Sequence, residues 1–336
     1  MESEQSRELN RAAVASLRRN LGLSEAEARR RFAAQAGLDA LSARLLKRLG
    51  ERQAGAWIDP ANGDLVVNVL NAEDAHTVEA AGAHARIVRH ASRQLVRLES
   101  ELNRTQLPRG SSLGIDPHAD AVVIDVPHGQ SFTPARDYKG AVVIKHSPAP
   151  ARRMATPATS ASTNAARADL YAGLTINRDA PGGVRCTSGF LITPKQSSGF
   201  HFNYLLTAGH CGGVGSKWFR GNSQIGSTSH SELGPNDFST IALNDYATWQ
   251  PQPWSYTQNG PQPVRGGYTV STTGSTVCMR GSSTEYNCGQ VLDLNASYFS
   301  STNNDQISGV VKTSLCAIPG DSGAPVTVPN GSGVLG

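Results

Sequence analysis

The sequence predicts an α+β first half followed by an all-β second half, because three compositional differences divide the chain near its middle. Residues 1–168 carry 23 Lys and Arg with 18 Asp and Glu, whereas residues 169–336 carry 8 and 9. The first half has 10 glycines, and the second half has 24. All five cysteines lie in the second half. A charged first half and a Gly-rich, cysteine-containing second half indicate two units with separate cores.

The charge and hydropathy of the chain exclude some classes of partner. A net charge of +4 over 336 residues gives no reason to expect nucleic acid or an acidic membrane. The sequence has no run of about 18 or more apolar residues, so we expect no membrane span. Residues 1–19 are charged and lack an apolar stretch, so no signal peptide is visible in them.

Residues 1–146 are expected to alternate helices and strands. Ser24 followed by Glu27 is a capping-box pattern that predicts a helix over 25–35, which Gly37 would end. A second helix is expected over 40–49. Residues 57–69 predict a hairpin with Asn-Gly at 62–63 as its turn, and two further helices are expected over 74–81 and 91–104.

The hairpin pattern then returns at a constant offset. Ile-Asp-Pro at 58–60 recurs at 115–117, and the aliphatic run 65–69 recurs at 122–126. Such a repeat predicts two related α+β subdomains, although two short hairpins can also coincide by chance.

Residues 147–168 are rich in Pro, Ala, Ser and Thr and lack periodicity, which predicts an exposed linker that proteases can cut. From residue 170 onward, short alternating runs such as 186–193 and 289–294 are separated by Gly, Asn and Ser turns. This pattern is typical of a β-barrel or sandwich.

Three short segments carry candidate catalytic residues. His210 stands in Thr-Ala-Gly-His-Cys at 207–211, Asp237 precedes apolar residues at 238 and 241, and Ser322 stands in Gly-Asp-Ser-Gly at 320–323. A serine hydroxyl needs a base within hydrogen-bond reach to become a nucleophile, and that base needs a third group to orient it. The order His, Asp, Ser differs from the orders of subtilisins and α/β-hydrolases.

Each of these residues also has a structural interpretation. His210 could support a neighbouring disulfide, Asp237 could be a turn residue with Asp245 as its nearest rival, and Gly-Asp-Ser-Gly could be a surface turn. Their joint occurrence favours a nucleophile, its base and an orienting carboxylate. The backbone N–H groups of Gly320 and Ser322 are the expected oxyanion donors.

The sequence shows no Cys or His spacing typical of a zinc site, so we expect no metal and no cofactor. His210 and Cys211 are adjacent, which suits no such site.

These segments resemble the secreted bacterial branch of the chymotrypsin family, the streptogrisin and α-lytic protease group. Residues 170–336 resemble the protease domain, and residues 21–146 resemble the pro-region of α-lytic type through the segments 23–28 and 56–60. The resemblance implies two six-stranded antiparallel barrels, with His210 and Asp237 from the first and Ser322 from the second. It also implies the disulfides Cys186–Cys211 and Cys278–Cys288.

The resemblance implies a zymogen with a pro-region at 1–146, a linker with a processing site at 147–168 and a protease domain at 169–336. The pro-region would assist folding in cis, inhibit the enzyme and be removed near 167–170. The substrates would be proteins or peptides, and the enzyme would be a secreted monomer without nucleic-acid or membrane partners. Cysteines that can pair favour an oxidising compartment.

Three departures from the family pattern are visible. Family members continue through more strands after the Gly-Asp-Ser-Gly segment 320–323, which we call the serine loop. The second barrel is therefore expected to be incomplete here, and Cys316 is expected to be unpaired. Met279 and then Arg280 follow Cys278 where the family usually has an arginine directly after this cysteine, supporting the aspartate of the serine loop. Ala324 replaces a more common glycine.

Two other functions compete with the zymogen interpretation. The chain could be an inactive remnant whose first half acts as a binding or chaperone module, because an incomplete barrel exposes strand edges. A serine esterase on another fold is disfavoured by the residue order and because Ser322 does not stand in a G-x-S-x-G motif.

Overall fold

The computed structural model describes residues 4–148, 156–157, 168–192, 204–244, 249–257, 260–264, 266–284, 286–301, 305–328 and 334–335. Most of the expected linker over 147–168, the rival Asp245 and part of the expected processing site at 167–170 lie outside these residues.

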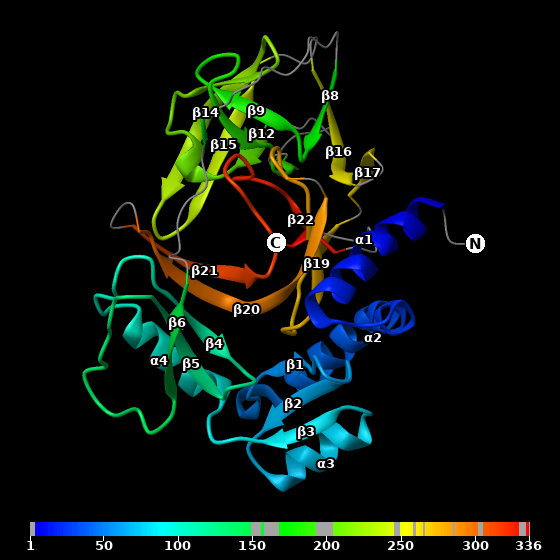
Figure 1. Ribbon diagram of the computed structural model, residues 1–336, viewed down its shortest axis with the longest axis vertical. Coiled ribbons are helices and arrows are strands. Elements are labelled where there is room, and N and C mark those ends of the chain that lie inside the picture. Colours follow the sequence, from blue (N-terminus) through cyan, green and yellow to red (C-terminus); the bar gives the residue numbers. More distant parts are fainter. Residues whose placement is uncertain are drawn as a thin grey trace.

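Helices occur in the first half of the described chain, and most strands lie in the second (Figure 1). The α-helices are α1 Glu4–Leu21, α2 Glu25–Leu49, α3 Ala72–Ala80 and α4 Ser92–Leu102, with 3-10 turns at Gly50–Arg52 and Gly209–Cys211. The strands of the first half are β1 Ala56–Ile58, β2 Leu65–Val69, β3 His84–Ile87, β4 Ser112–Asp116, β5 Ala121–Pro127, β6 Val142–Ser147 and β7 Thr156–Pro157. The strands of the upper β-region are β8 Ala168–Ala172, β9 Thr175–Arg178, β10 Val184–Thr187, β11 Leu191–Ile192, β12 Tyr204–Thr207, β13 Lys217–Arg220, β14 Ser223–Leu233, β15 Asp237–Leu243, β16 Trp249–Thr257 and β17 Gly260–Pro263. The remaining strands form the lower β-region. They are β18 Gly267–Tyr268, β19 Thr276–Met279, β20 Asn287–Phe299, β21 Gln306–Thr313, β22 Val326–Thr327 and β23 Val334–Leu335.

The N-terminal helices differ from the expectation in two ways. Ser24 caps α2 by accepting a hydrogen bond from the Glu27 N–H at 3.2 Å, as predicted, but α2 continues through Gly37 to Leu49. The prediction of two helices separated at Gly37 was therefore wrong. A glycine inside a helix lowers the stability by only about 1 kcal/mol relative to alanine. Burial of Leu45 and Leu49 against the residues of β1 and β2 offsets this cost. The helix α1 was not predicted.

The two strand units of the first half share one arrangement, as the repeat predicted. In the first unit β1 and β2 are antiparallel and β3 is parallel to β2. In the second unit β4 and β5 are antiparallel and β6 is parallel to β5. The helix α3 connects β2 to β3, whereas an irregular segment over 128–141 connects β5 to β6. Each unit has its own apolar core.

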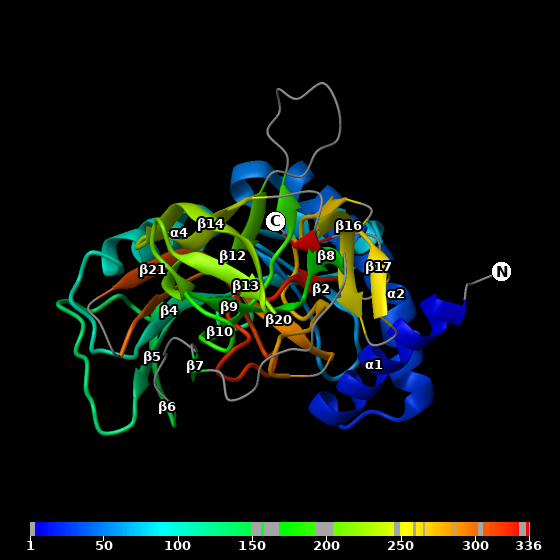
Figure 2. The ribbon, with the colours of Figure 1, turned by 90° about the horizontal axis from the view of Figure 1, so that it is seen from above.

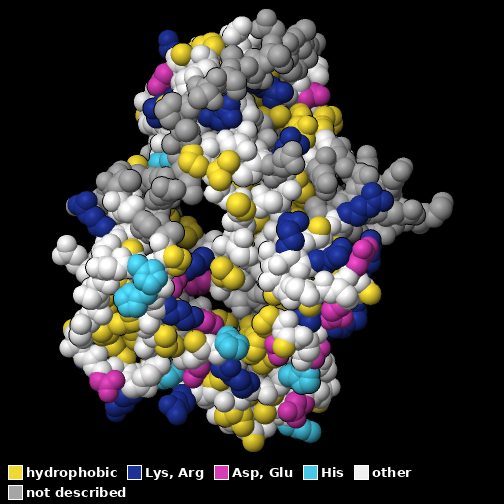
Figure 3. All heavy atoms as spheres, in the orientation of Figure 1, with side chains coloured by type: hydrophobic (Ala, Val, Ile, Leu, Met, Phe, Trp, Pro, Cys, Tyr) yellow, Lys and Arg dark blue, Asp and Glu magenta, His cyan; other side chains and the backbone are white. Residues whose placement is uncertain are grey.

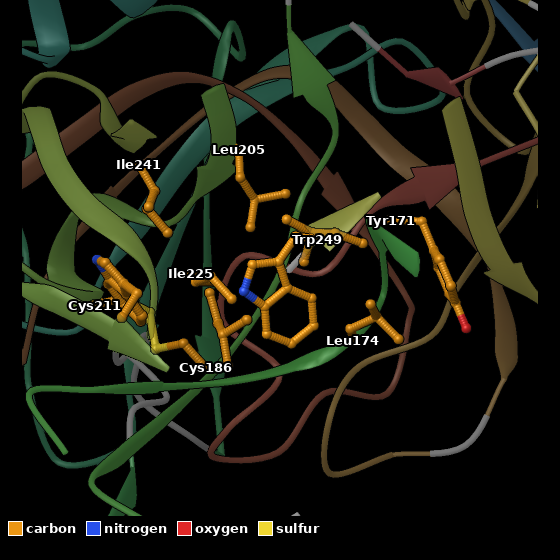
Figure 4. Packing of buried hydrophobic residues seen from close by; sticks show 11 residues of the cluster. Tyr171, Leu174, Cys186, Leu205, Cys211, Ile225, Ile241 and Trp249 are labelled. Atoms are coloured by element: carbon orange, nitrogen blue, oxygen red, sulfur yellow. A yellow bond between two sulfur atoms is a disulfide. The ribbon is translucent and has the colours of Figure 1, made fainter. Parts of the chain in front are cut away.

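Most strands of the upper β-region form one curled sheet with the strand order β11-β12-β15-β14-β13-β9-β10-β7, in which β7 of the first half is an edge strand. Its core includes Leu205, Ile225, Trp249 and the disulfide Cys186–Cys211, which lies beside Ile225 (Figure 4). Two pairings in the second half depart from the antiparallel barrels that we expected: β8 lies parallel to β16 in a separate sheet with β17, and β18 lies parallel to β23. Within the described residues the fold is otherwise the expected mostly antiparallel β-structure.

The two halves share one sheet, in which β20 of the second half pairs with β4 of the first. The order is β18-β23-β22-β19-β20-β4-β5-β6, and β21 also pairs with β20. Ser297 lies opposite Leu113 in the β20–β4 pair, so the sheet of the second α+β unit continues the sheet of the lower β-region (Figure 1).

The helices α1 and α2 cover the other side of the lower β-region, away from β4–β6 (Figure 2). The side-chain amide of Gln35 makes two hydrogen bonds to the backbone of Thr276. It accepts from the N–H of Thr276 at 2.8 Å and donates to the carbonyl of Thr276 at 3.0 Å. The hydroxyl of Ser275 donates to Asp39 at 2.6 Å. These bonds satisfy polar groups that the contact buries. No helix in the described part of the chain is long and apolar enough to cross a membrane.

Candidate active site

His210 is held by the turn that follows β12. The 3-10 turn Gly209–Cys211 begins two residues after β12 ends, and the disulfide Cys186–Cys211 ties its last residue to β10. A Cβ on Gly209 would lie 2.1 Å from the Glu232 carbonyl oxygen, so only glycine permits this close approach. The turn therefore projects the imidazole from a fixed backbone.

Asp237 reaches His210 because β15 pairs with β12. Thr207 lies opposite Ser239, which places the first residue of β15 beside the turn. One carboxylate oxygen of Asp237 lies 2.7 Å from Nδ1 of His210, and the other accepts the backbone N–H of His210 at 2.8 Å. A proton on Nδ1 is thereby held toward the carboxylate, and Nε2 is left as the acceptor.

Ser322 completes the alignment from the far end of the chain. Its Oγ lies 2.8 Å from Nε2 of His210, although 112 residues separate the two in sequence. Gly323 has φ +88°, and a Cβ there would lie 2.3 Å from the Thr207 hydroxyl. The residue after Ser322 must therefore be glycine for the serine loop to approach β12 this closely. The structure thus brings together His210, Asp237 and Ser322.

The serine loop takes an unusual backbone at Gly320, where φ is +105° and a Cβ would lie 2.1 Å from the Ser283 hydroxyl. An L-residue with a side chain is strained at this φ, so the conformation depends on glycine. The carbonyl of Gly320 accepts two hydrogen bonds, from the hydroxyls of Thr187 and Ser282.

Asp321 is supported by backbone N–H groups. The buried carboxylate accepts N–H bonds from Ser283 and Thr284 at 2.8 and 3.0 Å, and from Ile318 at 2.8 Å. Three N–H donors can compensate a buried carboxylate without an ion pair. The sequence carried no signal for these donors, because any residue other than proline supplies an N–H.

Arg280 has a different partner. Its guanidinium lies 3.6 Å from the centre of the Tyr256 ring and donates to the Thr257 carbonyl at 3.4 Å. Cation–π contact of this kind is favourable. Arg280 therefore packs against β16 and bonds to its last residue.

The remaining cysteines pair as the resemblance implied. A disulfide joins Cys278 to Cys288 between β19 and β20, and Cys316 is an exposed free thiol. Its N–H donates to the Asn287 side chain at 3.1 Å. Among the described residues, no three His, Cys, Asp or Glu side chains are grouped so that they could hold a metal ion.

A cavity of about 650 Å³ opens in front of the three aligned side chains. His210 and Ser322 line one side, and Ser112 and Asp125 of the first half line another. Lys312 of β21 pairs with Asp125 at 2.6 Å and donates to Ser112 at 3.1 Å, which holds the two halves together at the cavity wall. In the space-filling view the molecule is hollowed between the upper β-region and the lower sheet (Figure 3).

A curled, mostly antiparallel β-structure that aligns a His, an Asp and a Ser occurring in this order along the chain defines the chymotrypsin-like class of serine proteases. Comparison with known proteins agrees. Residues 26–88 match the family model of the α-lytic protease pro N-terminal region. The chain is 33% identical to Streptogrisin-C of Streptomyces griseus over 317 residues, covering 92% of this chain and 65% of that protein.

A second relative, Serine protease 2 of Streptomyces fradiae, is 34% identical over 163 residues, which cover 47% of this chain and 87% of that protein. The crystal structure of a Nocardiopsis protease aligns at 28% identity and a TM-score of 0.42, over 50% of this chain and 81% of the other. The chain belongs to the streptogrisin and α-lytic protease group of bacterial chymotrypsin-like serine proteases. It spans about two thirds of the length of Streptogrisin-C.

Proposed function

We propose that the chain is the zymogen of a secreted serine endopeptidase. The observation that carries the proposal is the continuous hydrogen-bonded row from Asp237 through His210 to Ser322, with distances of 2.7 and 2.8 Å. These distances lie within the range in which a base accepts the proton of a nucleophile. Residues 1–146 would be the pro-region, 147–168 a linker with the processing site and 169–336 the protease domain.

The chemistry follows from the three side chains. Ser322 Oγ attacks the carbonyl carbon of the scissile peptide bond while Nε2 of His210 takes the hydroxyl proton. Asp237 holds the Nδ1 proton and stabilises the imidazolium that forms. The N–H groups of Gly320 and Ser322 bind the oxyanion. His210 then gives its proton to the leaving amine, and water hydrolyses the acyl-enzyme by the same steps in reverse. No step requires a cofactor.

The first half acts on the protease in cis as folding assistant and inhibitor. Pairing of β4 with β20 supports this role, because it completes backbone hydrogen bonds that β20 would otherwise leave open. Ser112 and Asp125 line the cavity that faces Ser322, so the first half narrows the approach of a protein substrate. Removal of the pro-region would open this approach.

The localisation proposal rests on the disulfides. Cys186–Cys211 and Cys278–Cys288 are both buried, and disulfides persist in oxidising compartments outside the cytosol. The proposed enzyme acts as a monomer on protein or peptide substrates.

Labelling of the purified full chain with a fluorescent fluorophosphonate tests the proposal. This reagent phosphonylates a serine only when a base and an oxyanion site activate it. We expect label on the chain, loss of label in Ser322→Ala, and full label in Ser229→Ala, which removes an exposed hydroxyl on β14. A chain without Ser322-dependent label would instead be the remnant, with its first half as the functional module.

A further inference from the structure

Thr187 connects three segments around the candidate site. It is the last residue of β10 and is fully buried, with 0% of its surface exposed. Its hydrogen bonds reach the serine loop, the loop over 281–284 and the end of β12. The proposed mechanism gives the side chain of Thr187 no role.

The hydroxyl of Thr187 fixes the carbonyl of Gly320. It donates to that oxygen at 2.9 Å and accepts the N–H of Ser282 at 2.8 Å. The Ser282 hydroxyl donates to the same carbonyl at 2.6 Å. A hydroxyl has one proton and a carbonyl oxygen has two lone pairs, so the Thr187 proton and both acceptor positions of Gly320 are used.

The backbone of Thr187 fixes the two neighbouring segments. Its N–H donates to the Ser322 carbonyl at 2.8 Å, and its carbonyl accepts the Thr207 hydroxyl at 2.9 Å. Thr207 ends β12, three residues before His210. A single buried residue therefore binds the peptide group that joins Gly320 to Asp321, the peptide group that follows Ser322, and the strand that leads to the histidine.

We infer that Thr187 is a positioning residue: it holds the peptide group between Gly320 and Asp321 and the one after Ser322, so that the N–H groups of Gly320 and Ser322 in the same loop keep the orientation needed for oxyanion binding. The inference rests on the proposed function. Gly320 has φ +105° and no side chain to restrict it, so the conformation of the serine loop depends on partners outside the loop. Oxyanion donors contribute to catalysis only when they are oriented before the charge develops. The two hydroxyl bonds to the Gly320 carbonyl supply this orientation.

The test compares three variants of the full chain. Thr187→Val keeps the shape of the side chain and the backbone bonds but removes the hydroxyl, whereas Thr187→Ser keeps the hydroxyl. Ser188→Ala is the matched control, because its buried hydroxyl bonds the Leu174 N–H and the Tyr171 carbonyl and has no bond to the serine loop. Acylation of each variant by p-nitrophenyl acetate is followed by stopped flow over a range of ester concentrations.

We expect Thr187→Val to lower the acylation rate constant about tenfold to a hundredfold and to leave the half-saturating ester concentration unchanged. Thr187→Ser should recover most of the rate, and Ser188→Ala should match the unsubstituted chain. An unchanged rate constant in Thr187→Val, or a Thr187→Ser variant as slow as Thr187→Val, would overturn the inference.

A chain that is not acylated at all would disprove the proposed function but still test Thr187. Hydrogen exchange of the peptide over 314–328 then measures how often the serine loop opens. The inference requires exchange about tenfold faster in Thr187→Val and near normal in Thr187→Ser. Equal exchange in all variants would mean that the Thr187 hydroxyl does not hold the loop.

Discussion

Asn295 of β20 donates its side-chain N–H to the carboxyl group of Glu99 in α4, across the contact between the two halves, at 2.9 Å. Glu99 is 1% exposed, and its other oxygen, Oε1, has no hydrogen-bond partner in the described structure. Burial raises the pKa of Glu99 to about 7, and the nearby Asp293 contributes to this rise. Asp293 is itself buried against Gly114, and burial raises its pKa to about 6. The contact therefore favours the protonated carboxyls.

The other charges around this contact are already paired. Asp125 pairs with Lys312 at 2.6 Å, and Asp116 lies 3.5 Å from Lys145. The imidazole of His118 lines the same cavity as Asp293. Lys312 favours the ionised form of Asp293 but is already paired with Asp125, so ionisation of Glu99 and Asp293 would add negative charge that Lys312 balances only in part. Buried charge that is not fully paired is costly.

The first prediction is that this contact weakens as the pH rises. A carboxyl whose pKa is raised in the folded state contributes its stability below its ordinary pKa near 4.5 and loses it as the pH rises to about 7. The Glu99→Gln variant of the Ser322→Ala chain should match its parent at pH 4 and exceed it by up to about 3 kcal/mol at pH 8. Urea unfolding across this range measures the difference. Glu101→Gln, on the exposed face of α4, is the control, and equal pH profiles for Glu99→Gln and its parent would refute the prediction.

The second prediction concerns the space in which Asp321 lies. A Cβ on Gly281 would lie 2.0 Å from the Asp321 carboxylate, which must then leave its three N–H donors. Gly281→Ala should destabilise the chain by roughly 2–3 kcal/mol and slow fluorophosphonate labelling at least tenfold. Gly213→Ala is the matched control, because nothing lies within 4 Å of a Cβ at that position. Normal labelling of Gly281→Ala would mean that the Asp321 carboxylate can move without disturbing Ser322.

The candidate site was predictable because each of its side chains lies in a local motif. His210 and Ser322 require glycines beside them for close backbone approach, and such glycines are visible in a sequence. The support of Asp321 was not predictable, because its donors are backbone N–H groups from two loops. The pairing of β4 with β20 was equally hidden, since any strand edge offers the same hydrogen bonds.

A third prediction follows from the continuous helix α2. Gly37 adopts a helical conformation, and a Cβ there meets nothing within 4 Å. Gly37→Ala should therefore stabilise the chain by about 1 kcal/mol, because alanine loses less backbone entropy on folding and clashes with no neighbour. Urea unfolding monitored by circular dichroism measures the gain. A loss of stability would mean that the helix needs glycine at this point.

The last prediction separates Arg280 from the support of the serine loop. Arg280 stacks on Tyr256 and bonds the Thr257 carbonyl, so its loss should destabilise the chain without disabling Ser322. Arg280→Met should cost about 1 kcal/mol and leave the fluorophosphonate labelling rate within about twofold of normal. Tyr256→Leu should cost a similar amount, and the double variant should cost less than the sum, because both single changes break the same contact. Additive losses would show that the stacking contributes little. A labelling rate that falls more than tenfold in Arg280→Met would show that Arg280 supports the serine loop after all.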